Sequence, residues 1–154
     1  MCRSFFLTIL CGLLAAPLPA AAATGRIIKV LPQFLDLKGQ NSLSPSLYDR
    51  DAYQVYLRQH PGKRSAMRFA VQWKTHGGVF EPLKLRVELR GTAKGDLPSH
   101  VVLEKEVTSA GWFSHWTWIA LTGEEYWKFG DVTAWRATLW EGDRLLGEQK
   151  SFLW

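Results

Sequence analysis

The sequence predicts an all-β fold, an antiparallel two-sheet sandwich of about seven strands with one inserted helix near residues 47–59. Segments 66–74 and 83–90 alternate apolar and polar residues, which is typical of antiparallel strands with one buried and one wet face. The chain closes on a hairpin, Val132–Trp154, whose two aromatic-rich runs flank Gly142-Asp143. Glycine at the first central position suits a type II′ turn. Together these features predict an antiparallel sandwich.

Residues 1–23 have the layout of a secretory signal peptide, so we expect one folded domain over residues 24–154. Arg3 precedes the apolar run Phe5–Ala16, and two prolines and the alanines 20–23 follow. The apolar run is shorter than the roughly 20 residues that a membrane span needs. We therefore expect a periplasmic or secreted protein, with no transmembrane span in the mature chain.

Cysteine content and charge narrow the class of protein further. The only cysteines, Cys2 and Cys11, lie in the predicted signal peptide, so the mature domain has no disulfide, which favours the bacterial periplasm. Without Arg3 the chain has 18 Lys and Arg against 14 Asp and Glu, a net charge of +4. These charges are scattered rather than gathered in a block, so we expect no nucleic-acid partner.

The early part of the chain predicts an edge strand and the helix. The branched run Ile27–Leu31 stops at Pro32, which lacks the donor that a central strand needs. Ser46 with Asp49 resembles a capping box, and Pro61 closes the segment 47–59. Tyr48, Ala52, Val55 and Tyr56 recur at helical spacing between these signals.

Two further strands are expected over 101–107 and 112–121, and the second has two aromatic-rich faces. Ile119 and Leu121 are assigned to the core, which leaves Trp112, Trp116 and Trp118 on the other face. We expect the helix to cover these rings, because an open tryptophan face is too large for a soluble monomer. A helix that projects away would make a ligand site at these rings the better explanation.

One core should bury the apolar side of every strand. The predicted members are Met67, Phe69, Val71, Trp73, Leu85, Val87, Leu89, Ile119, Trp135 and Leu139.

The order of elements resembles an immunoglobulin-like or fibronectin type III-like domain. The resemblance depends on the polar crossing 122–130 with its aromatic Tyr126, which leads into a long penultimate strand and the closing hairpin. It covers residues 66–154 and concerns topology. Trp73 lacks the flanking cysteines of antibody domains, so the antibody family itself is excluded.

Catalytic and metal-binding motifs are absent from the sequence. His60, His76, His100 and His115 share no ligand spacing, so we expect neither a metal nor another cofactor. No nucleophile elbow, zinc-protease motif or phosphate-binding loop occurs. We therefore expect a binding domain rather than an enzyme.

The predicted function is that of an exported, soluble, non-catalytic binding domain. Strands 83–90, 132–140 and 145–153 should share one sheet. Cations beside an aromatic ring on its outer face would suit another exported protein or a cell-envelope glycan. The alternatives are a carbohydrate-binding module that uses exposed Trp and Arg, and a small outer-membrane β-barrel, suggested by the aromatic end of the chain. The candidate site residues are Lys84, Arg86, Arg90, Arg136 and Trp140.

Overall fold

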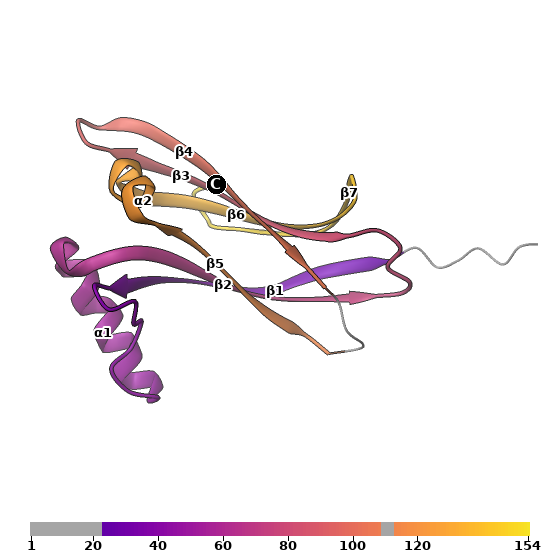
Figure 1. Ribbon diagram of the computed structural model, residues 1–154, viewed down its shortest axis with the longest axis horizontal. Helices are drawn as coiled ribbons and strands as arrows, with labels where there is room; N and C mark the ends of the chain where they lie inside the picture. Colours follow the sequence, from indigo (N-terminus) through magenta and orange to yellow (C-terminus); the bar gives the residue numbers. More distant parts are fainter. Residues whose placement is uncertain (1–22, 109–112) are drawn as a thin grey trace, which may run out of the picture.

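Seven strands form two antiparallel sheets in the part of the chain that the computed structural model describes, residues 23–108 and 113–154 (Figure 1). The three-stranded sheet has the order β1-β2-β5 and the four-stranded sheet the order β4-β3-β6-β7. The elements are β1 (Thr24–Asp36), α1 (Leu47–Gln59), a 3₁₀ turn (Pro61–Lys63), β2 (Arg64–His76), β3 (Leu83–Ala93), β4 (Leu97–Val107), β5 (His115–Thr122), α2 (Gly123–Phe129), β6 (Asp131–Glu141) and β7 (Arg144–Lys150). The predicted all-β, two-sheet fold with one helix inserted early is confirmed. Most of the predicted signal peptide and Trp112 lie outside the described residues.

The core lies between the two sheets and contains the predicted apolar faces. Phe69, Val71 and Trp73 of β2 face Leu85, Val87 and Leu89 of β3, and each of these six side chains is at most 1% exposed. Met67, Ile119 and Leu139 are buried in the same cluster, whereas Trp135 packs against it half-buried. The strand facing predicted from the period-two pattern is therefore confirmed.

Strand β1 lies at the edge of its sheet, as predicted, but it continues through Pro32, where the sequence predicted a break or a change of partner before residues 34–37 resume. Phe34 directs its backbone N–H and C=O away from β2, because both bond to the side chain of Gln54 in α1. Pro32 lies two residues earlier and therefore faces the same free edge. Its missing N–H removes no bond to β2, so the strand is not interrupted.

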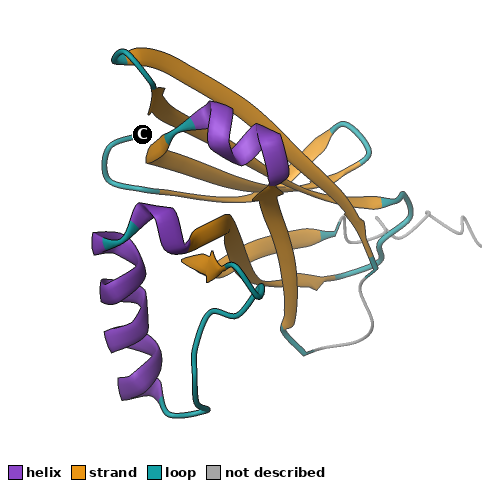
Figure 2. Ribbon diagram, turned by 60° about the vertical axis from the view of Figure 1, so that its left-hand side comes forward, coloured by secondary structure: helices purple, strands orange, loops and turns teal. Residues whose placement is uncertain are grey.

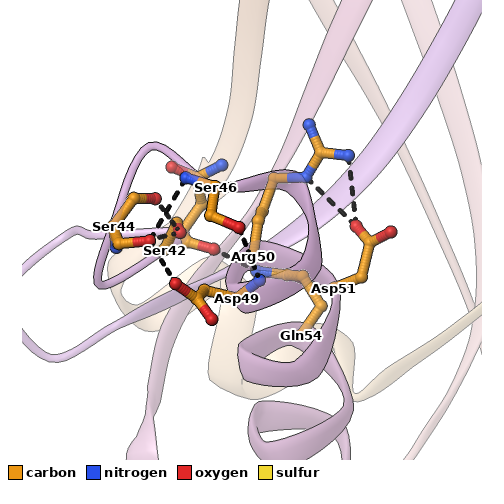
Figure 3. Close-up of polar contacts among 8 residues, drawn as sticks. Ser42, Ser44, Ser46, Asp49, Arg50, Asp51 and Gln54 are labelled. Atoms are coloured by element: carbon orange, nitrogen blue, oxygen red, sulfur yellow. Dashed lines mark hydrogen bonds and ion pairs between the residues drawn. The ribbon is translucent and has the colours of Figure 1, made fainter.

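Helix α1 has the predicted bounds, and local contacts fix its start (Figure 3). The Ser46 hydroxyl accepts a hydrogen bond from the N–H of Asp49 at 3.5 Å, which is half of the predicted capping box. The Asp49 carboxylate accepts instead from the Ser44 hydroxyl at 2.5 Å. The Ser46 hydroxyl thus satisfies one backbone N–H that the first helical turn leaves open, and the Asp49 charge suits the N-terminal end of the helix dipole.

The other end of α1 is fixed by Arg64 of β2, which is 5% exposed. Its Nε donates to the carbonyl of Leu57 at 2.6 Å, and Nη2 donates to the carbonyl of Arg58. Leu57 is the buried residue of the helix. The helix is therefore held at β1 and at the start of β2, and it lies on the side of the three-stranded sheet that faces away from the other sheet (Figures 1 and 2).

The prediction that α1 covers the tryptophans of β5 is wrong. Trp116 and Trp118 are 39% and 51% exposed, and α1 contacts β1 rather than β5. The apolar stripe Tyr48, Val55 and Tyr56, expected to face the sheet, is exposed. The helix docks instead through neighbouring positions, because Gln54 and Leu57 make the contacts that hold it.

The last third of the chain contains the predicted hairpin and one unexpected helix. Gly142 and Asp143 join β6 to β7, and Gly142 has the positive φ of 53° that the turn requires. The segment predicted as a polar crossing forms α2, which buries Tyr126 and Phe129 at the end of the core. Within the described residues, no helix is long and apolar enough to span a lipid bilayer.

Candidate functional site

The five residues predicted to form a site do share the outer face of the four-stranded sheet. In the register, Lys84 lies opposite Trp140, and Arg86 and Arg136 occupy the next rows of the same face. The strand pairing expected from the sequence is therefore confirmed, and β4 adds its own outer side chains to this surface.

The predicted cations of this surface, named here the charge-paired face, have partners, whereas Lys150, which lies opposite Arg136 on β7, forms no ion pair with another described residue. Lys84 pairs with Glu104 at 3.3 Å, and Arg136 pairs with Glu148 at 2.8 Å. Arg86 lies 3.5 Å from Glu88 and 3.7 Å from Glu104. Such pairs leave little charge for a ligand.

The remaining two predicted site residues also contact neighbours. Arg90 stacks on the ring of Trp154, with its guanidinium carbon 4.1 Å from the ring centre. Trp140, which is half-buried, donates from Nε1 to the hydroxyl of Thr138 at 2.9 Å. Both side chains are thus held by contacts within the protein.

The outer face of the three-stranded sheet differs in both aromatic content and charge. We name it the tryptophan face and define it by the outward residues of β1, β2 and β5. These are Arg26, Lys29, Leu31, Gln33, Leu35, Ala66, Arg68, Ala70, Gln72, Lys74, Trp116, Trp118, Ala120 and Thr122. Trp116 lies opposite Gln72, and Trp118 lies opposite Ala70, so the two rings occupy adjacent rows of one edge strand.

These positions carry four cations and no carboxylate, which distinguishes them from the charge-paired face. None of Arg26, Lys29, Arg68 and Lys74 forms an ion pair with another described residue. Cross-strand diagonal neighbours lie about 7–8 Å apart, within reach of long side chains. Arg68 is in this position relative to Trp118, and Lys74 relative to Trp116.

Arg68 is the most constrained of these cations. Its Nη2 donates to Oε1 of Gln33 at 2.8 Å, and its buried Nε has no hydrogen-bond partner. Burial lowers the pKa of the guanidinium, because the charged form loses water. A positive charge held in this way, beside a neutral amide and without a carboxylate, favours the approach of an anion.

Helix α1 bounds the tryptophan face on the β1 side. A cavity of about 280 Å³ lies between Leu31 and Gln33 of β1 and the helix residues Val55 and Arg58. Arg50 and Asp51 also border this cavity and pair with each other at 3.1 Å. The sheet thus forms a floor with the tryptophans at one edge, and α1 rises beside the opposite edge (Figure 2).

A second cavity, of about 650 Å³, lies where edge strands β4 and β5 meet. It is lined by both tryptophans of the face, by Trp73 and His115, and by one cation and one carboxylate, Lys105 and Glu106. Trp73 is fixed there, because its Nε1 donates to the hydroxyl of Thr117 at 2.9 Å and its ring contacts that of His115. Trp116 and Trp118 are therefore exposed on the outer face of the sheet and also line the cavity between β4 and β5.

Among the described residues, no three His, Cys, Asp or Glu side chains are placed to hold a metal ion. Asp36 is a carboxylate that contacts α1, and its pKa is lowered. Burial alone would raise its pKa, but hydrogen bonds from the N–H groups of Gln40 and Lys38 and from the Tyr53 hydroxyl outweigh burial. Asp36 is thus a structural anchor for α1.

No family model matches this chain, and neither the curated proteins nor the solved structures contain a match to it. The site must therefore be argued from its own geometry. The sequence indicated that Trp116 and Trp118 share a face, but the helix was predicted to cover them. They were not grouped with Arg68 and Lys74. The alternation in 66–74 was the available signal, since it places these cations on the outer side of β2.

Proposed function

We propose that this chain is an exported binding domain, and that the tryptophan face is its ligand surface. The observation that carries the proposal is the exposure of Trp116 and Trp118, at 39% and 51%, beside unpaired cations. Large rings usually become buried, so two adjacent ones left open mark an interaction surface. The charge-paired face is the weaker candidate, because the cations predicted to form its site have carboxylate or aromatic partners.

The proposal includes an immunoglobulin-like topology for the sandwich. Its support is the distribution of strands, with the first, second and fifth in one sheet and the third, sixth and seventh in the other. The fourth strand pairs with the third, where variable-type domains also place their added strands. In such sandwiches a sheet face is free to bind while the core maintains the fold.

The proposal is tested with a matched pair of double variants. Trp116→Ala/Trp118→Ala removes the rings, whereas Arg86→Glu/Arg136→Glu reverses two charges on the opposite sheet. Each protein is incubated with bacterial cell-wall sacculi and, separately, with an immobilised periplasmic extract. We expect the wild-type protein to be retained by one of these materials, and the tryptophan variant to be retained at least about 10-fold less.

The arginine variant should be retained like the wild-type protein. Circular dichroism and urea unfolding show that each variant is folded before binding is compared. Wild-type retention no greater than that of the tryptophan variant on both materials would overturn the proposal. Loss of retention in the arginine variant alone would move the site to the charge-paired face.

A further inference from the structure

The spacing of the two rings indicates the shape of the ligand. Trp116 and Trp118 are two residues apart on β5, so their attachment points lie about 7 Å apart along the strand. A single small ring cannot cover both, whereas a chain of linked rings can lie across them. The negative face of an indole attracts the weakly positive C–H groups on the face of a sugar ring, which makes a pyranose chain a suitable occupant.

Polar groups beside the rings suit hydroxyl-bearing ligands. Gln72 lies opposite Trp116, and its Nε2 donates to the hydroxyl of Ser114 at 3.0 Å. Its Oε1 accepts no hydrogen bond from a described residue and can therefore accept one from a ligand hydroxyl. An amide fixed next to a stacking ring orients a sugar as well as binding it.

The charges beside the rings select an acidic ligand. Lys29 shares a row with Gln72 and Trp116, while Arg68 and Lys74 lie diagonally from the two rings. No carboxylate occupies an outward position of this sheet to neutralise them. A ligand with an acidic group on its sugar rings would place that group beside one of these cations whenever a ring stacks on a tryptophan.

Helix α1 bounds the tryptophan face on the β1 side and leaves the β5 side open. The helix extends from the same side of the three-stranded sheet on which the rings lie (Figures 1 and 2). A chain of sugar rings that stacks on both tryptophans would run along β5, at the edge of the sheet opposite the helix.

We propose that the tryptophan face binds an acidic polysaccharide, a chain of sugar rings that bear carboxylate, sulfate or phosphate groups. This inference rests on the proposed function, since it names the ligand class of the same surface. The rings of Trp116 and Trp118 stack on the sugars, Gln72 accepts from a hydroxyl, and Lys29, Arg68 and Lys74 attract the acidic groups.

The test is affinity electrophoresis and calorimetry of the full-length mature protein with two matched pairs of polymers. Polygalacturonate is compared with its methyl ester, and dextran sulfate with dextran, so that each pair differs only in charge. The charge variant is Lys29→Glu/Lys74→Glu, and its matched control on the opposite sheet is Lys84→Glu/Lys150→Glu. Trp116→Phe/Trp118→Phe keeps a stacking surface and is compared with the double alanine variant.

We expect the acidic member of at least one pair to bind at least about 10-fold more tightly than its neutral counterpart, and binding to weaken as salt is added. Both Lys29→Glu/Lys74→Glu and the double alanine variant should lose about 10-fold or more. The opposite-sheet control and the double phenylalanine variant should stay within about 3-fold of the wild-type protein. The polymer that binds identifies the acidic group as carboxylate or sulfate, and a phosphodiester-linked teichoic acid supplies the phosphate arm.

Different failures separate this inference from the proposed function. Equal binding of neutral and acidic polymers, lost in the double alanine variant, would overturn the acidic specificity and leave the binding surface intact. Tighter binding to oligothymidylate or to phosphatidylglycerol vesicles, with the same dependence on the tryptophans, would replace the polysaccharide by that partner. Binding to none of these probes, together with no retention on sacculi or extract, would overturn both proposals.

Discussion

Gln54 joins α1 to the sheet, and replacing it with alanine should weaken the docking of the helix, which Arg64 and Leu57 still hold. Its Oε1 accepts from the N–H of Phe34 at 2.7 Å, and its Nε2 donates to the carbonyls of Phe34 at 2.9 Å and Asn41 at 2.8 Å. The amide therefore occupies the place of a neighbouring strand at the free edge of β1. Gln54→Ala removes all three bonds and leaves the sheet otherwise unchanged.

The magnitude follows from the number of bonds and their surroundings. A typical hydrogen bond contributes about 1 kcal/mol net, so three give an upper value of about 3 kcal/mol. Phe34 and Asn41 are only half-buried, so water can rehydrate part of the freed backbone. We therefore expect the free energy of unfolding to fall by about 2 kcal/mol.

Gln59→Ala is the matched control, because Gln59 is exposed on the same helix and the helix-propensity gain is the same. Urea unfolding gives the difference between the two variants, and hydrogen exchange of the α1 amides shows whether the loss is local. A Gln54→Ala loss no larger than that of Gln59→Ala would refute the reasoning, since the three bonds would then contribute no net stability.

Three further predictions concern the loop before β6, the core and the anchor of α1. Gly130 has a φ of 82°, and an added Cβ would lie 2.1 Å from a carbonyl oxygen of β3, so Gly130→Ala should cost more than about 2 kcal/mol in thermal unfolding. A loss below about 1 kcal/mol would show that the loop relaxes. Trp73→Ala should cost about 3–5 kcal/mol and exceed Trp135→Ala in urea unfolding, because Trp73 is 1% exposed and Trp135 is half-buried; equal losses would contradict this ordering. The hydrogen bond to Asp36, followed by burial, raises the pKa of Tyr53 to about 12. The stability that this bond gives the folded state is therefore complete below 10.0, the ordinary pKa of tyrosine, and is lost as the pH rises toward 12. In a Tyr126→Phe background, which removes another tyrosine whose pKa is raised by burial, tyrosinate absorbance should show this late titration and its return toward 10.0 in Asp36→Asn; an unchanged late titration would exclude the carboxylate as its cause.

Much of the fold could be predicted from the sequence, because local patterns specify it. The side-chain period of a strand is two residues, so the alternation in 66–74 and 83–90 determined which residues of β2 and β3 face the core. The bounds of α1 follow from signals at its ends, Ser46 and Pro61. Gly142 likewise specified the turn of the last hairpin, since its positive φ is a local requirement.

The sequence was less informative about the candidate site, because the site depends on contacts between distant segments. The spacing of Tyr48, Val55 and Tyr56 predicted an apolar packing face, but α1 docks through Gln54 and Leu57. Helical periodicity shows which residues share a face, and it does not show which face meets the sheet. Bonds to the edge of β1 and to Arg64, both outside the helix, determine that choice.

Charge pairing was also decided by the tertiary structure. Lys84 and Arg86 were grouped from their own strand, but Glu104 reaches them only because β4 lies beside β3. On the other sheet, the register brings together Lys29, Gln72 and Trp116 from three separate strands, with no carboxylate in an outward position. The sequence alone determined the facing of individual strands, because that depends on a local period. Only the tertiary structure determined which strands are neighbours, and hence which charges are neutralised and which rings stay open.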